Sequence, residues 1–71
     1  MDEREARNDL DKAEADIANA QKRVQHQRGL IEKLARDGHD TAAAEDLLRI
    51  LLVSLDAMET HRRTILTELG I

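Results

Sequence analysis

The sequence predicts an all-α protein, an antiparallel two-helix hairpin of coiled-coil type that dimerises into a four-helix bundle. Apolar residues recur at steps of four and three on either side of a glycine-marked corner, which is the spacing of an apolar stripe on a helix. The 71-residue chain contains no proline, which would break the hydrogen bonding of either helix. We expect a single domain with helices over about 2–36 and 42–69, joined by a turn at 37–41.

The first helix, residues 2–36, has charges that favour its macrodipole. Asp2 and Glu3 lie in its first turn and Lys33 and Arg36 in its last, and each such exposed charge contributes about 0.3–1 kcal/mol. Gly38 is placed to adopt the left-handed conformation that ends many helices. The apolar stripe of this helix consists of Ala6, Leu10, Ala13, Ile17, Ala20, Val24, Ile31 and Leu34.

The second helix follows Asp40 or Thr41, and either side chain can supply the oxygen that caps its first turn. It is expected to end near Leu69. The short connection makes the helices antiparallel neighbours, which places Ile17 near Arg62. The apolar stripe of this helix consists of Ala44, Leu48, Leu51, Leu55, Met58, Ile65 and Leu69.

Polar residues interrupt both stripes. Gln27 and Arg62 occupy stripe positions, and we interpret them as residues that penalise slipped alignments of the helices. A polar pocket inside the bundle is the alternative interpretation. Arg62 should extend along the core and pair with Glu14 or Asp16. Gly29, in the middle of the first helix, marks either a close contact between helices or a slight bend, and the sequence leaves both open.

The second helix is apolar on two sides, and one neighbouring helix cannot cover both. Two helices of this size also enclose too small a core to be stable alone, and no cysteine is present to form a disulfide or thiolate metal site. We therefore expect a two-fold symmetric homodimer, with a complex with another helical protein as the alternative. The residues expected in the interface are Leu47, Ile50, Leu51, Leu52, Val53, Leu55 and Met58.

The histidines offer the only candidate chemistry. His26 should lie on the solvated face of the first helix, opposite Val24, and His61 at the edge of the apolar arc of the second. They do not converge within one hairpin, so we expect no metal and no other cofactor. Dimerisation hairpins of histidine kinases carry an exposed phosphoacceptor histidine, which makes phosphorelay an alternative function. Neither His26 nor His61 is followed by the acidic residue that such a motif normally contains.

The composition argues against several classes of function. The formal net charge of −4 and the absence of aromatic residues disfavour binding to nucleic acid. The longest apolar run, residues 50–53, is far shorter than the ~20 residues that cross a membrane, so we expect no membrane partner. The charged start of the chain lacks an apolar leader segment, which favours a cytoplasmic location. The single serine, Ser54, lies among leucines and gives no support to an enzyme.

Charge alternates in blocks along the chain. Residues 2–16 carry a net charge of −4, residues 21–36 carry +4, and residues 37–71 carry −4. The hairpin therefore places the basic half of the first helix beside the acidic start of the second, and this orients the helices more than it stabilises them.

The stretch LIEKLARDGHDTAAAEDLLRILLVSLDAMETHRRTIL resembles a recurrent type of short bacterial two-helix protein, most specifically in the DGHDT corner at residues 37–41. The resemblance covers about residues 23–70. It implies a helical hairpin in a bacterial cytoplasm and implies no activity or functional residues. We therefore expect a non-enzymatic protein–protein interaction module, a small homodimeric adapter or regulator.

Overall fold

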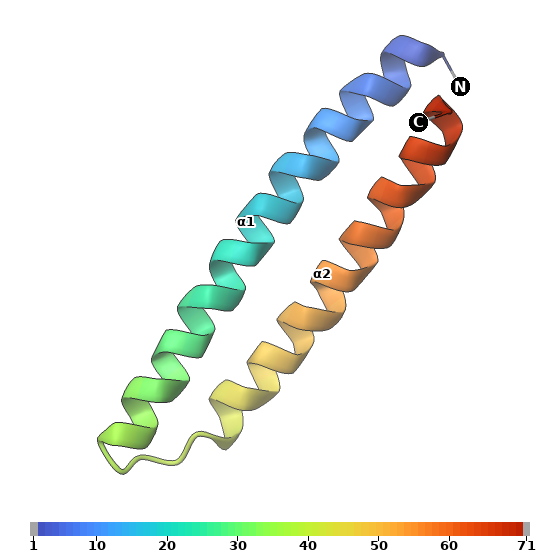
Figure 1. Ribbon diagram of the computed structural model, residues 1–71. Helices are drawn as coiled ribbons and strands as arrows, with labels where there is room; N and C mark the ends of the chain where they lie inside the picture. The colour runs from blue at the N-terminus through green and yellow to red at the C-terminus, as the bar shows by residue number, and fades with distance from the viewer. Residues whose placement is uncertain (1, 71) are drawn as a thin grey trace.

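The computed structural model describes residues 2–70 and consists of two long helices side by side. Helix α1 spans Glu3–Arg36 and helix α2 spans Ala42–Leu69. The two run antiparallel, so both ends of the chain lie at one end of the rod and the connection lies at the other (Figure 1). The rod measures 53 × 15 × 14 Å. The predicted all-helical hairpin is confirmed.

Asp2 caps the start of α1. Its backbone is extended, and its side-chain carboxylate accepts a hydrogen bond from the backbone N–H of Arg4 at 3.3 Å. This bond satisfies one of the N–H groups that the first turn leaves without a partner. Glu3 pairs with Arg7 one turn later, at 3.1 Å between Oε1 and Nε. The acidic first residues thus start the helix through specific contacts as well as through the macrodipole.

The corner after α1 is a Schellman motif. The N–H of Gly38 donates to the carbonyl of Ala35 at 3.1 Å, and the N–H of His39 donates to that of Leu34 at 2.9 Å. Gly38 has a φ of +75°, the left-handed conformation expected from the sequence. Glycine has no Cβ and adopts this conformation without strain, so the helix can end at this position.

The cap of α2 comes from Asp40. Its carboxylate accepts from the N–H of Ala42 at 3.0 Å, whereas the side chain of Thr41 makes no capping bond. The sequence left both residues open, and the structure selects Asp40. At the other end, Gly70 has a φ of +75° and donates its N–H to the carbonyl of Thr67 at 3.1 Å.

The core of the hairpin is thin. Among residues 2–70 the buried apolar side chains are small or medium in size, and no side chain is completely buried. Helix α1 supplies the small residues of the seam, and α2 covers them with larger side chains that stay half-buried, such as Leu48, Leu51 and Leu55. The buried apolar residues are Ala6, Ala13, Ile17, Ala20, Val24 and Ile65.

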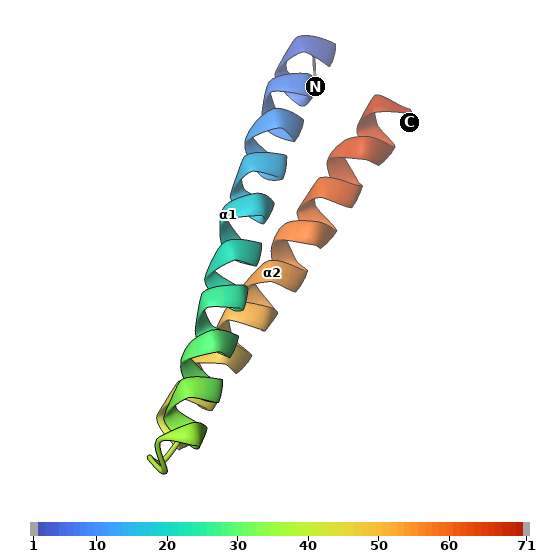
Figure 2. The same ribbon diagram turned by 60° about the vertical axis from the view of Figure 1, so that its left-hand side comes forward.

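Two observations around Arg62 establish the register between the helices. Ile17 and Arg62 line the same depression, as the sequence predicted. Arg62 donates to Glu14 at 3.3 Å, one of the two partners expected for it. The helices are inclined to each other, so that their ribbons overlap near the connection and separate toward the chain ends in Figure 2.

The structure shows no close contact between the two helices of the hairpin at Gly29. A Cβ built on Gly29 would meet nothing within 4 Å, and Gly29 is exposed within an unbroken α1. Gly29 makes no such contact within the hairpin because it lies outside the four-and-three stripe that faces α2.

Candidate interaction surface

Large exposed apolar side chains lie in the half of the hairpin near the connection, and three of them, Leu47, Ile50 and Val53, share one face of α2. Ile50 is 65% exposed and Val53 is 68% exposed. Scattered single apolar side chains are normal on a surface, but neighbouring ones indicate a binding surface. The exposed large apolar residues of the described chain are Leu30, Leu47, Ile50, Leu52 and Val53, and we call them the apolar patch.

The structure divides the predicted interface residues into two groups. Leu51, Leu55 and Met58 are half-buried at stripe positions of α2 and belong to the seam within the hairpin. The others, Leu47, Ile50, Leu52 and Val53, are exposed. The first group supports the hairpin itself, and only the second is fully available to another chain.

Leu30 is a member of the patch that sequence reasoning missed. It is 40% exposed on α1, next to the half-buried stripe residue Ile31. Its position one residue before a stripe position was the available signal, because neighbouring residues on a helix point about 100° apart.

Shallow depressions flank the patch on both sides of α2. One, of about 350 Å³, has an almost entirely apolar lining that includes Leu47, Leu51, Lys22 and Arg23. Lysine and arginine present apolar stems beneath their charges, so such a wall accepts apolar side chains from a partner.

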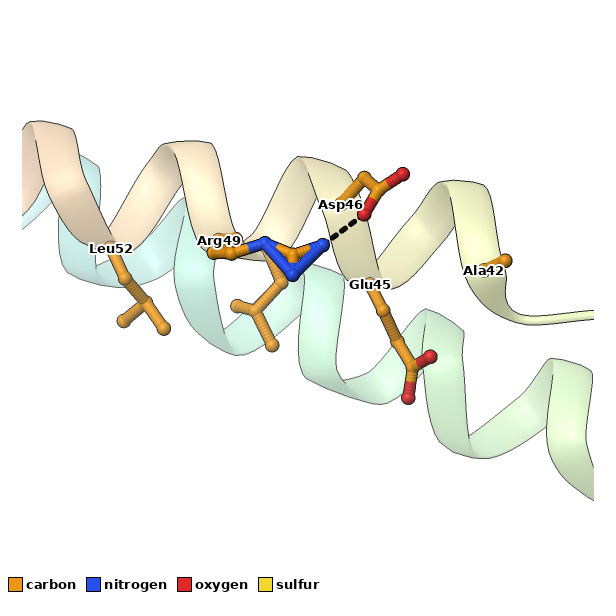
Figure 3. Close-up of a pocket in the computed structure, with 6 residues that line it drawn as sticks. Ala42, Glu45, Asp46, Arg49 and Leu52 are labelled. Atoms are coloured by element: carbon orange, nitrogen blue, oxygen red, sulfur yellow. Dashed lines mark hydrogen bonds and ion pairs between the residues drawn. The ribbon is translucent and has the colours of Figure 1, made fainter.

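The second depression, of about 420 Å³, includes Leu52 and Glu45. In Figure 3 these two side chains project on the same side of α2, on either side of the ion pair between Arg49 and Asp46. This edge of the patch is therefore charged, as the rim of an interface typically is.

Gln27 is buried to 5% exposure and donates its Nε2–H to the backbone carbonyl of Ala44 at 2.9 Å. The bond joins the middle of α1 to the first turns of α2. The bond gives the buried amide an acceptor on the facing helix and so avoids the free-energy cost of an unsatisfied polar group, while its role in fixing the register stays a prediction.

The histidines lie apart from each other. His26 lines the depression beside Leu47 and Leu51, whereas His61 lines a different one with Asp16 and Ser54. Both histidines are exposed. Within residues 2–70, no group of three or more His, Cys, Asp or Glu side chains is arranged to hold a metal ion. Neither helix has a stretch long and apolar enough to cross a membrane.

Comparison of the chain with known protein families, with curated proteins and with solved structures gives no match. The surface described above is therefore the basis for assigning a function.

Proposed function

We propose that the chain is a non-enzymatic protein–protein interaction module of the cytoplasm, a small homodimeric adapter or regulator in which two hairpins pack into a four-helix bundle. The observation that carries the proposal is the exposed apolar face of α2 formed by Leu47, Ile50 and Val53, next to a core in which no side chain of residues 2–70 is completely buried. A second hairpin seated on the patch removes this exposed surface and thickens the core at the same time.

The size of the effect supports association. Burying a Val, Leu or Ile side chain completely is worth about 1.5–3 kcal/mol, and Ile50 and Val53 each have roughly two thirds of that still to gain. Small domains without disulfides or metals rarely reach a stability above about 5 kcal/mol from one core. The free energy gained by burying these side chains is thus large in comparison with the stability that a single hairpin can have.

The interface should contain Leu47, Ile50 and Val53 at its centre, because they share one face of α2 at steps of three, whereas Leu52 points about 160° away from Ile50. Leu51, Leu55 and Met58 are half-buried on the neighbouring face of α2, in the seam with α1, and lie beside this centre. Charged side chains at the edge, such as Arg49 and Asp46, remain in contact with water.

Sedimentation equilibrium at micromolar concentration tests the proposal. The unchanged chain should have twice the 8.0 kDa mass of one copy. Ile50→Asp should shift it to a helical monomer, because a carboxylate cannot be buried in an apolar interface without a large free-energy cost. The matched control is Thr60→Asp, an exposed position on α2 outside the patch, which should leave the mass unchanged.

A folded monomer of the unchanged chain, stable to heating, would overturn the homodimer. A helical monomer that remains marginally stable would favour the alternative in which the same patch binds a different helical protein.

A further inference from the structure

The apolar patch occupies only one half of the hairpin. Its members fall within residues 30–53, next to the connection. The buried apolar side chains lie mostly toward the chain ends, at Ala6, Ala13, Ile17 and Ile65 among others. The exposed large apolar side chains of the described chain therefore lie in the half of the hairpin near the connection, and the half near the termini has none.

On α2 the apolar surface has a symmetric order about Ile50. Ala43, Leu47, Ile50, Val53 and Ala57 are all exposed, at steps of four, three, three and four. At about 100° per residue they all lie within about 60° of the direction of Ile50. The stripe thus has a small residue at each end and three large residues in the middle, so the order of side-chain sizes is the same along the helix in both directions.

Charge is unequal between the two halves. In the half near the connection, the +4 of residues 21–36 and the −4 of residues 37–57 cancel. In the half that carries the termini, residues 2–20 contribute −4 and residues 58–70 contribute none in net. Two such halves side by side would repel each other, and this repulsion is absent when they lie at opposite ends of a dimer.

We propose, on the basis of the homodimer above, that the two α2 helices meet antiparallel about a two-fold axis at Ile50. Ile50 then packs on Ile50 of the second copy, Leu47 packs on its Val53, and Ala43 lies opposite its Ala57. The size order of the stripe permits this pairing, and the acidic halves, which would lie side by side in a parallel dimer, favour it over the parallel one. The hairpins overlap through their connection halves, and the two acidic halves project from opposite ends, free to contact other proteins.

Distances between spin labels test the arrangement, and the absence of cysteine from the chain allows single labels. The exposed residues His39 and Glu68 are replaced one at a time, as His39→Cys and Glu68→Cys. Glu68 is 18 positions from Ile50, so at 1.5 Å per residue the two labels at position 68 should be ~54 Å apart, and those at position 39 ~30 Å apart. A parallel dimer would place both pairs within ~20 Å.

Disulfide formation between variants provides a second measurement. When Ala43→Cys and Ala57→Cys chains are mixed and oxidised, the mixed disulfide should predominate at least several-fold over either symmetric one. If the chain still sediments as a dimer, symmetric disulfides would overturn the antiparallel arrangement and leave the homodimer standing. Labels at position 68 within ~20 Å of each other would have the same consequence. A monomeric chain would overturn the homodimer as well.

Discussion

Gly29→Ala should stabilise the protein, although glycine in the middle of a long helix could suggest a special role. Gly29 is exposed on α1, its φ is not positive, and a Cβ added there would meet nothing within 4 Å. The substitution therefore adds no steric cost to the folded state. It also reduces the conformational freedom of the unfolded chain, and glycine costs about 0.8–1 kcal/mol relative to alanine inside a helix.

We expect the free energy of unfolding to rise by about 1 kcal/mol and the melting temperature by roughly 4–8 °C. Urea unfolding followed by circular dichroism at 222 nm measures the first quantity, with the chain concentration held constant because the midpoint of a dimer depends on it. The slope of the transition should stay unchanged, since the substitution does not alter the surface exposed on unfolding.

The matched control is Gly38→Ala, at the Schellman corner. A Cβ there also meets nothing within 4 Å, but the φ of +75° makes the substitution strained. It should destabilise the protein by about 1 kcal/mol. A loss of stability in Gly29→Ala would refute the reasoning and show that the position needs glycine for a contact outside the single hairpin.

Two further substitutions test the seam and the corner. Leu51→Asp should lower the free energy of unfolding by about 3 kcal/mol, because it places a carboxylate in the half-buried seam between the helices. Thermal melting followed by circular dichroism measures the loss. An unchanged melt would mean that Leu51 does not face α1. Asp40→Ala should cost about 1 kcal/mol in the same assay, because the N–H of Ala42 loses its acceptor. Asp40→Asn, which keeps a carbonyl oxygen in place, should retain most of that stability, and equal losses in the two variants would contradict the capping role.

The start and end of each helix could be read from the sequence. The corner depends on groups a few residues apart: Gly38 and His39 donate to carbonyls of the preceding turn. Such contacts hardly depend on the rest of the protein, so the residue types at Asp37–Gly38 were sufficient evidence. The choice between Asp40 and Thr41 was harder, because both side chains can cap a helix and only the path of the backbone decides which oxygen reaches an N–H.

The candidate interaction surface could be read only in part. The two-sided apolar character of α2 predicted the exposure of Ile50 and Val53 correctly. Leu30 was missed, because its exposure depends on how far α2 covers the neighbouring groove. Of the two roles that the sequence left open for Gly29, a contact within the hairpin does not occur, and a contact with another chain stays a prediction for the Gly29→Ala test.

The sequence by itself determined the local order of this protein: two helices, their caps, the corner at Gly38 and the alternation of apolar residues along each seam. These follow from helical periodicity and from hydrogen bonds between groups a few residues apart. Only the tertiary structure decided that Gln27 reaches the carbonyl of Ala44, that Arg62 pairs with Glu14, and that the half near the connection stays open. These features depend on the register and inclination of one helix against the other, which arise from the packing of side chains far apart in the chain.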